Sequence, residues 1–388
     1  MRPIYLDYNA TTPLAPAVYT AMEPYLRTHF GNPSSDHPYG DIARQAVATA
    51  RQQVATMVRA DPAQVIVTGG GSEAINQVLK GLAFSRRKRG THLITSAVEH
   101  PAVAQTMAWL ATQGFQVTTV PVDQHGMVDP AAVSDAITDQ TTLISIMHTQ
   151  NEVGTIQPIA AIAALARERH ILMHTDAAQS VGKIPVTLAD LGIDVLTVAG
   201  HKFYGPKGIG AIVLRDDLPL PPLIHGAGHE QGRRAGTENV PSIVGLGVAC
   251  ALVAESLPQT ADTMRRLRDT LEARLNAAIP GLLVNGHPTE RLPNTLNVSL
   301  PDSNAAALLT AIRNQVAYST GSACHAGHAA PSAVLLAMGR TPAQAAAALR
   351  LSLGRDTTGA DIDQAAMIIG DAYHRLRLAG DQPEEPSA

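Results

Sequence analysis

The sequence predicts an α/β fold with a mostly parallel sheet covered by helices on both faces. Apolar runs of strand length alternate with segments of helical periodicity, such as residues 75–82 and 159–166. This alternation is typical of strand–helix–strand units, whose strands are buried on both faces. The expected strands of this sheet are residues 65–67, 92–95, 143–147, 171–174, 195–198 and 209–214.

The character of the chain changes after about residue 255. A charged segment of helical periodicity, residues 264–278, leads into short strands and alanine-rich helices. The short strands are expected at residues 282–284, 295–300 and 316–319. We therefore predict a large α/β domain over residues 15–255, a smaller α+β domain from residues 1–14 and 256–378, and a polar, disordered tail over residues 379–388.

Composition limits the classes of function. The chain has 388 residues, 45% of them hydrophobic, and a net charge of −4, which disfavours direct nucleic-acid binding through a basic face. The start of the chain does not resemble a signal peptide, and no uninterrupted apolar run reaches membrane-spanning length. Two cysteines, Cys250 and Cys324, fit a reducing compartment better than a disulfide framework. We expect a cytoplasmic protein that does not enter a membrane.

Lys202 lies beside His201 in a glycine-bounded turn that follows the expected strand 195–198. A partly buried lysine near another cationic group loses its proton more easily and can hold a carbonyl compound as a Schiff base. Asp176 follows the expected strand 171–174, at the end of a sheet where ligands bind. A carboxylate and a Schiff-base lysine are what pyridoxal phosphate requires. The alternatives are a solvated surface lysine and an aspartate that caps a turn.

Two further segments have the chemistry of a cofactor site. Three glycines, residues 69–71, precede Ser72 at an expected helix start, where free backbone N–H groups bind phosphate. A plain tight turn is the alternative. His100 follows the expected strand 92–95 and has the chemistry to stack on a flat ring or to move protons. A helix-start histidine without a ligand is the alternative.

Cys324 lies among small residues and glycines, a composition typical of an accessible loop. Such a loop suits a thiolate that moves into a pocket and out again. Two alternatives stay open: a buried inert cysteine, and a metal site made of Cys324, His325 and His328. The metal site is disfavoured because no second pair of ligands occurs at zinc-site spacing. Cys250, in an apolar run, is interpreted as a packed helix residue.

Together these segments closely resemble the cysteine desulfurases, which are pyridoxal-phosphate enzymes of the class V aminotransferase family with the aspartate aminotransferase-like fold type I. The resemblance runs from about residue 3 to about residue 375 and includes the subgroup with a long cysteine loop, similar to the nitrogen-fixation and housekeeping iron–sulfur desulfurases. The further motifs that carry it are residues 5–13, 31–35, 147–154, 233–239 and 349–355.

The resemblance implies a role for each of eleven residues. Pyridoxal 5′-phosphate would be held by Lys202 at its aldehyde, Asp176 at its ring nitrogen, Gln179 at its ring hydroxyl, His100 stacked on its ring, and Gly71, Ser72 and His201 at its phosphate. Thr237 would reach the phosphate of the other subunit in a homodimer. Asn151 and Arg350 would bind the substrate L-cysteine, and Cys324 would accept its sulfur as a persulfide, leaving L-alanine. Lys202, His100 and Cys324 would be the catalytic residues, and no metal is implied.

One position departs from the family pattern. The family usually has a serine directly before the Gly-His-Lys turn, where this chain has Ala199. The missing hydrogen bond weakens the phosphate site by about 0.5–1.5 kcal/mol. Several alternatives remain open. The persulfide sulfur would pass to an acceptor protein for iron–sulfur assembly, tRNA thiolation or DNA phosphorothioation. A selenocysteine lyase, a class V aminotransferase and a non-enzymatic binding scaffold are the rival functions.

Overall fold

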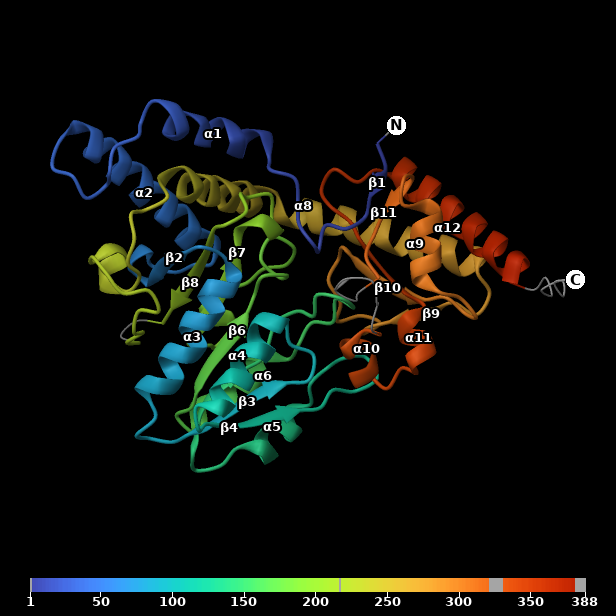
Figure 1. Cartoon of the computed structure of the whole chain (residues 1–388), viewed down its shortest axis with the longest axis horizontal. Helices are drawn as coiled ribbons and strands as arrows, with labels where there is room; N and C mark the ends of the chain where they lie inside the picture. Colours follow the sequence, from blue (N-terminus) through green and yellow to red (C-terminus); the bar gives the residue numbers. More distant parts are fainter. Residues whose placement is uncertain (1, 216–217, 321–330, 381–388) are drawn as a thin grey trace, which may run out of the picture.

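The structure is a computed structural model that describes residues 2–215, 218–320 and 331–380. Its centre is a seven-stranded sheet in the order β2-β8-β7-β6-β5-β3-β4 (Figure 1). All neighbours are parallel except at β8, which runs antiparallel to both β2 and β7. The predicted mostly parallel sheet is confirmed. Its strands are β2 (Val65–Thr68), β3 (His92–Ser96), β4 (Gln116–Val120), β5 (Thr141–Ser145), β6 (Leu172–Asp176), β7 (Val195–Ala199) and β8 (Gly210–Leu214).

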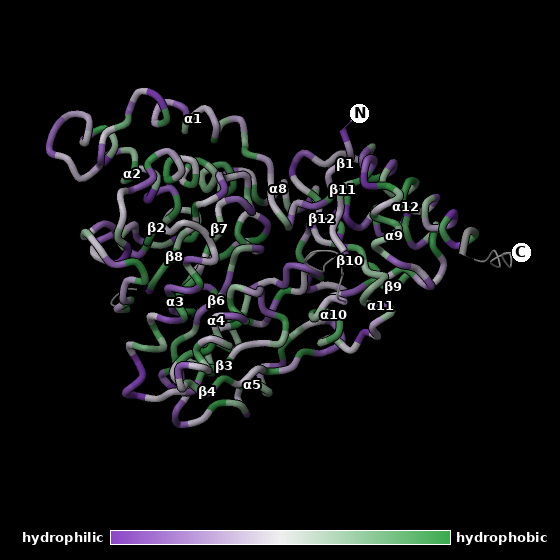
Figure 2. Tube along the Cα trace, viewed as in Figure 1, coloured by the Kyte–Doolittle hydropathy of each residue, from purple (hydrophilic) through white to green (hydrophobic). Residues whose placement is uncertain are grey.

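Helices cover both faces of this sheet because successive strand residues point to opposite sides. In β2, Ile66 packs with α3 (Gly71–Ser85) and α4 (Pro101–Thr112), whereas Val65 and Val67 pack on the other face. Figure 2 shows hydrophobic stretches gathered inside these layers. The other face is covered by α1 (Pro16–Arg27), α2 (Pro38–Met57), α5 (Pro130–Ala136), α6 (Ile159–Glu168) and the first half of α8 (Val240–Ala278).

A second hydrophobic cluster lies around a three-stranded antiparallel sheet in the order β12-β10-β9. The first strand of the chain, β1 (Ile4–Tyr5), pairs with β11 (Val316–Ala317) beside it. The other elements of this part are β9 (Leu283–Asn285), β10 (Thr295–Ser299), β12 (Ala348–Ser352), α9 (Ala305–Ile312), α10 (Ala333–Ala337), α11 (Pro342–Ala346) and α12 (Gly359–Gly380). Short elements complete the fold: α7 (Leu188–Leu191) and the 3₁₀ turns η1 (Pro62–Gln64), η2 (Gly200–Lys202) and η3 (His229–Gly232).

Helix α8 joins the two parts of the molecule. It continues through Pro258, so the predicted domain border at residues 255/256 lies inside one helix. Its first half belongs to the large-sheet cluster, and Leu271 and Leu275 belong to the second. The division into two domains stays a prediction. The predicted tail begins within the last turn of α12, and residues 381–388 lie outside the described residues.

Three strands of the structure were not expected: β1, which is only two residues long, β4 and β12. Strand β4 was not expected because its residues are partly exposed and do not form an apolar run. Strand β12 was not expected because a buried arginine, Arg350, interrupts its apolar pattern. Among the described residues, α8 is the one helix long and apolar enough to cross a membrane, although no uninterrupted apolar run was expected to do so. Half of its apolar stretch is buried inside the protein, as in a core helix.

Candidate active site

A cavity of about 180 Å³ lies at the carboxyl ends of β6 and β7, where a parallel sheet places its ligands. Every residue predicted to hold the cofactor lines it, apart from Thr237. Asn151, predicted to bind substrate, lines it as well, and so does Ala199. The lining residues are Gly71, Ser72, Ile75, His100, Met147, Thr149, Asn151, Asp176, Ala178, Gln179, Ala199, His201 and Lys202.

Lys202 enters this cavity from η2, the turn directly after β7. Its Nζ atom donates hydrogen bonds to the backbone carbonyls of Asn9 and Ala10, at 2.7 and 2.9 Å. Burial, followed by the positive charge of Arg350, lowers the pKa of Lys202 to about 8. The neutral amine, which is the form that attacks a carbonyl carbon, is therefore far more populated near neutral pH than in an ordinary lysine.

Asp176 ends strand β6 and is only 5% exposed. Its Oδ1 atom accepts a hydrogen bond from the backbone N–H of Ala178 at 2.9 Å. Burial raises the pKa of this carboxyl, and the nearby His100 and Lys202 act in the opposite direction. A buried carboxylate beside a lysine is suited to hold a protonated ring nitrogen, because that partner supplies the missing positive charge.

His100 precedes the first turn of α4, and its Nδ1 atom accepts a hydrogen bond from the backbone N–H of Ala102 at 3.1 Å. Burial lowers the pKa of His100, which favours the neutral ring. In that ring the proton is on Nε2, because Nδ1 acts as an acceptor. The helix start thus fixes both the orientation and the tautomer of a ring that lines the cavity.

The glycine-rich segment has the geometry of an anion site. Helix α3 starts at Gly71, and the preceding Gly70 has a φ of 135° and caps the helix with no side chain. The first N–H groups of this helix are therefore left for a ligand, and the helix dipole favours a negative charge there. A Cβ atom added at Gly71 would lie 3.2 Å from the Cβ of Ala199, so both small residues keep the cavity open.

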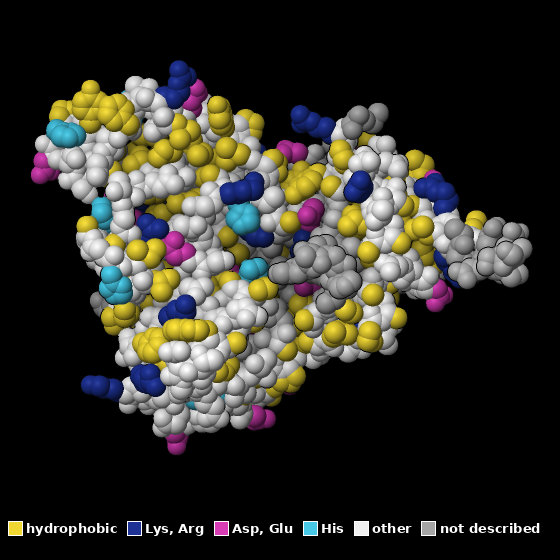
Figure 3. Space-filling view, in the orientation of Figure 1, with side chains coloured by type: hydrophobic (Ala, Val, Ile, Leu, Met, Phe, Trp, Pro, Cys, Tyr) yellow, Lys and Arg dark blue, Asp and Glu magenta, His cyan; other side chains and the backbone are white. Residues whose placement is uncertain are grey.

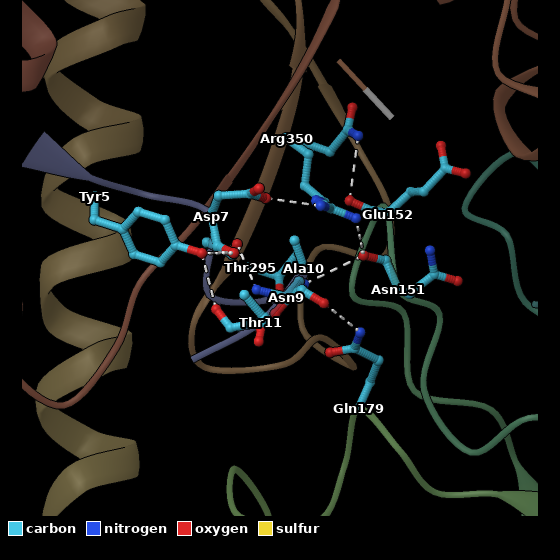
Figure 4. Close-up of polar contacts among 12 residues, drawn as sticks. Tyr5, Asp7, Asn9, Ala10, Thr11, Asn151, Glu152, Gln179, Thr295 and Arg350 are labelled. Atoms are coloured by element: carbon cyan, nitrogen blue, oxygen red, sulfur yellow. Dashed lines mark hydrogen bonds and ion pairs between the residues drawn. The ribbon is translucent and has the colours of Figure 1, made fainter. Parts of the chain in front are cut away.

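Arg350 lies next to the cavity rather than in its lining. Its NH2 group pairs with Asp7 Oδ1 at 2.8 Å, and its NH1 group donates to the carbonyl of Asn151 at 3.3 Å (Figure 4). The buried Nε atom has no partner among the described residues. A positioned guanidinium with a donor to spare, beside Asn151, is suited to bind a substrate carboxylate.

Thr237 is predicted to bind the cofactor but does not line the cavity. Thr237 lies in the segment between η3 and α8 and is exposed. Cys324 lies outside the described residues, together with His325 and His328. Within the described ranges no group of three or more metal-binding side chains occurs. Cys250 is fully buried in α8, as expected, and burial raises the pKa of its thiol strongly.

Sequence reasoning missed four groups that shape the site. The carbonyls of Asn9 and Ala10 hold Lys202, yet backbone atoms leave no signal in residue type. Lys183 lies behind Gln179, at Nζ–Oε1 2.6 Å. Glu99 accepts hydrogen bonds from the Ser96 hydroxyl and the Met147 N–H, and burial raises its pKa to about 8. The sequence signals for these groups are the motif 5–13, which is part of the family resemblance, and a charged residue directly before His100.

Comparisons with known proteins agree with this geometry. The profile of the class-V aminotransferase family matches residues 4–365. The chain belongs to this family. A cysteine desulfurase IscS of Methanosarcina thermophila is 44% identical over 96% of this chain and 93% of its own. Among solved structures, a NifS-like protein has a TM-score of 0.90 at 35% identity, with 97% of this chain and 100% of that chain covered.

A second solved structure, SspA in complex with cysteine, has a TM-score of 0.81 at 38% identity and covers 92% of this chain and 100% of that chain. The predicted family, the fold type I architecture and the dependence on pyridoxal phosphate are confirmed by these matches. The chemistry of the donors also fits that cofactor. The cavity offers an amine, a buried carboxylate and a helix start, and the buried Thr149 hydroxyl in its lining has no partner among the described residues.

Proposed function

We propose that this chain is a cysteine desulfurase, which removes sulfur from L-cysteine and leaves L-alanine and a persulfide on Cys324. The observation that carries the proposal is the meeting of Lys202 and Asp176 in one cavity, with Arg350 beside it. The relative from Methanosarcina thermophila is named as a cysteine desulfurase, and SspA was solved with cysteine. Both names agree with the activity predicted from the sequence.

The cofactor site is formed by the residues already described. Lys202 would hold the aldehyde, Asp176 the ring nitrogen, Gln179 the ring hydroxyl and His100 the ring face. Gly71, Ser72 and His201 would bind the phosphate. Bound there, pyridoxal phosphate supplies an electron sink that stabilises negative charge at the substrate α-carbon.

The protein residues would bind the substrate and move its protons. Arg350 and Asn151 hold the α-carboxylate, which fixes the direction of the α-carbon–hydrogen bond. Lys202, with a pKa of about 8, takes the α-proton at Nζ. The Cys324 thiolate attacks the substrate sulfur and the carbon–sulfur bond breaks. The sulfur stays on Cys324 as a persulfide, and the electron pair of the broken bond stays with the carbon fragment. That fragment takes up one proton at its β-carbon, regains one at its α-carbon and leaves as alanine.

The test distinguishes the proposed role of Lys202 in holding the cofactor from the proposed role of Cys324 in accepting sulfur. Cys324→Ala should keep the yellow cofactor and still bind L-cysteine, while alanine and sulfide formation fall by about two orders of magnitude or more, because no positioned thiolate remains. In the wild type, limiting cysteine without reductant should add about 32 Da to the peptide that contains Cys324. Cys250→Ala is the matched control and should be fully active, since this thiol is buried in α8.

Normal turnover by Cys324→Ala, or an added sulfur on Cys250, would contradict the proposal. A class V aminotransferase or a lyase would then replace it. Comparing selenocysteine with cysteine as substrate separates the remaining rival, a selenocysteine lyase.

We further propose a homodimer in which Thr237 completes the site of the partner. Apolar side chains are exposed over α1, α2 and the segment between them (Figure 3). They are Tyr19, Leu26, Phe30, Tyr39 and Ile42. A groove of about 530 Å³ between α2 and α8 continues this surface. Contiguous apolar surface of this kind is typical of subunit interfaces. Sedimentation should give a dimer at assay concentration, and a fully active monomer would refute it.

We propose, finally, a cytoplasmic location and a separate protein that accepts the persulfide sulfur. A persulfide formed on a loop cysteine has to leave the enzyme before the next turnover. Cell fractionation and transfer of ³⁵S from loaded enzyme to a co-purifying protein test these two points. Recovery in the membrane fraction, or sulfur released only as free sulfide, would contradict them.

A further inference from the structure

Lys183 is a buried lysine that the proposed reaction does not use. It lies in the turn after β6, and only 4% of its surface is exposed. It is not in the lining of the cavity. Gln179, four residues earlier, lies between Lys183 and the cavity and does line it. Lys183 therefore has no direct access to a ligand, and any effect on one has to pass through a neighbour.

The partners of Lys183 are neutral. Its Nζ atom donates to Gln179 Oε1 at 2.6 Å and to Asn9 Oδ1 at 3.2 Å. No ion pair with a carboxylate is formed by Lys183 within the described part of the chain. The charges that act on it are both positive, those of Lys202 and Arg350. Burial, followed by these two cations, lowers the pKa of Lys183 well below its ordinary value.

Such an arrangement is costly unless it serves a ligand. A buried cation without a counter-ion loses its hydration and gains little in return. Packing does not require it here, because Asn9 Oδ1 also accepts from Asn294 Nδ2 at 3.1 Å and so keeps a partner without the lysine. Arg350 pairs with Asp7, and Asp176 lies near Lys202, but no negative charge acts on Lys183, and an anionic ligand would supply one.

The contact also decides which way the Gln179 amide points. The Nζ atom of Lys183 donates to Oε1, so the oxygen of that amide faces Lys183. The NH₂ group then faces the other way, where it donates to the carbonyl of Asn9 at 2.9 Å (Figure 4). An amide nitrogen has two hydrogens, so a second donor remains for an acceptor atom in the cavity.

We propose that Lys183 is a positioning residue that locks Gln179 as a hydrogen-bond donor to the ring hydroxyl oxygen of pyridoxal phosphate and favours the anionic form of that oxygen. The inference rests on the proposed function, since it needs that cofactor in the cavity. The inference goes beyond the proposed function because it assigns Lys183 a role that acts through the neutral amide of Gln179. Lys183 and Lys202 also share Asn9, one at its side chain and one at its carbonyl.

The experiment measures cofactor affinity in the full-length apoprotein. Lys183→Met removes the charge and both donors at similar volume, and Lys88→Met, at an exposed lysine in the turn after α3, is the matched control. Each protein is titrated with pyridoxal phosphate and with the analogue that lacks the ring hydroxyl. In the wild type, loss of the hydroxyl should weaken binding about tenfold or more, the usual effect of losing a charge-assisted hydrogen bond.

Lys183→Met should bind pyridoxal phosphate about tenfold more weakly than the wild type and Lys88→Met. It should bind the analogue as well as they do, because the contact that Lys183 organises is missing there. The absorption spectrum of the bound cofactor should also change. Lys183→Gln keeps a neutral donor and should recover part of the affinity. If Lys183→Met does not fold, Lys183→Gln allows the same comparison between pyridoxal phosphate and the analogue.

Equal losses for the cofactor and the analogue would mean a general structural role and would overturn the inference. Unchanged affinity in both variants would overturn it too. Failure of the wild type to bind pyridoxal phosphate at all would instead overturn the proposed function. The readouts therefore keep the two hypotheses distinguishable.

Discussion

Two cavities lie at opposite ends of the seven-stranded sheet. The smaller, of about 180 Å³, is at the carboxyl ends of β6 and β7 and holds Lys202 and Asp176. The larger, of about 610 Å³, lies where the parallel strands begin, next to the first residues of β6 and β7. Five arginines line it: Arg59, Arg86, Arg89, Arg167 and Arg215.

Access to water, rather than the number of charged side chains, decides how strongly the charges in each cavity interact. In the larger cavity, the side chain of Arg215 is 57% exposed and pairs with Asp194 at 2.7 Å. In the smaller one, Asp176 is 5% exposed, and burial shifts the pKa values of Lys202 and Asp176 toward their neutral forms. Charges interact strongly only where water is excluded. Cavity volume is therefore a poor guide to the reactive site in this protein.

The largest effect is expected from Lys202→Ala. The variant should lose covalent attachment of the cofactor and all measurable desulfuration, because no other amine among the described residues lines the cavity. Borohydride reduction followed by peptide mapping measures attachment. Lys88→Ala, at an exposed lysine, should behave like the wild type. A reducible adduct at native stoichiometry in Lys202→Ala would contradict the assignment.

The second expectation concerns pH. With a pKa of about 8, Lys202 is mostly protonated at pH 7 and mostly neutral at pH 9. Capture of pyridoxal phosphate by the apoprotein should therefore accelerate about fivefold from pH 7 to 8 and less than about twofold from pH 8 to 9. Stopped-flow absorbance measures the rate. If the capture rate still rises tenfold per pH unit above pH 9, the pKa of Lys202 is that of an ordinary lysine and the expectation is wrong.

A smaller gain is expected from Ala199→Ser. The serine hydroxyl would enter the cavity beside Gly71, at the start of α3, and donate a hydrogen bond to the phosphate. Affinity for pyridoxal phosphate should rise by up to about tenfold. Ala199→Val adds volume without a donor and should weaken binding. Equal affinities for the serine variant and the wild type would show that the phosphate does not lie at this position.

The smallest effect should come from the larger cavity. Arg86→Gln removes a positive charge there, far along the sheet from Lys202, and should change cofactor affinity and cysteine turnover by less than about twofold. The same titration and sulfide assay measure both. If Arg86→Gln lost as much cofactor affinity or turnover as a substitution in the smaller cavity, the two ends of the sheet would be coupled. The contrast between the two cavities would then be wrong.

The sequence alone determined the fold class and most of the candidate site. Alternating apolar runs and helical periods depend on local backbone geometry, so they predicted every strand of the seven-stranded sheet except β4. In the smaller sheets, β1 and β12 were missed. Lys202, Asp176 and His100 were predicted because each follows an expected strand, and strand ends of a parallel sheet meet at one edge. The family motifs extended this to Gln179 and His201.

Only the tertiary structure decided which groups are buried together. The carbonyl of Asn9 receives Lys202 and Gln179, yet a carbonyl is the same in every residue and has no sequence signature. Lys183 reads as an ordinary surface lysine, and its loss of water depends on contacts between segments far apart in the chain. The continuity of α8 through Pro258 is a similar case. The local sequence pattern predicts strands, helices and the residues at their ends. Burial and the balance of nearby charges depend on tertiary contacts between distant segments.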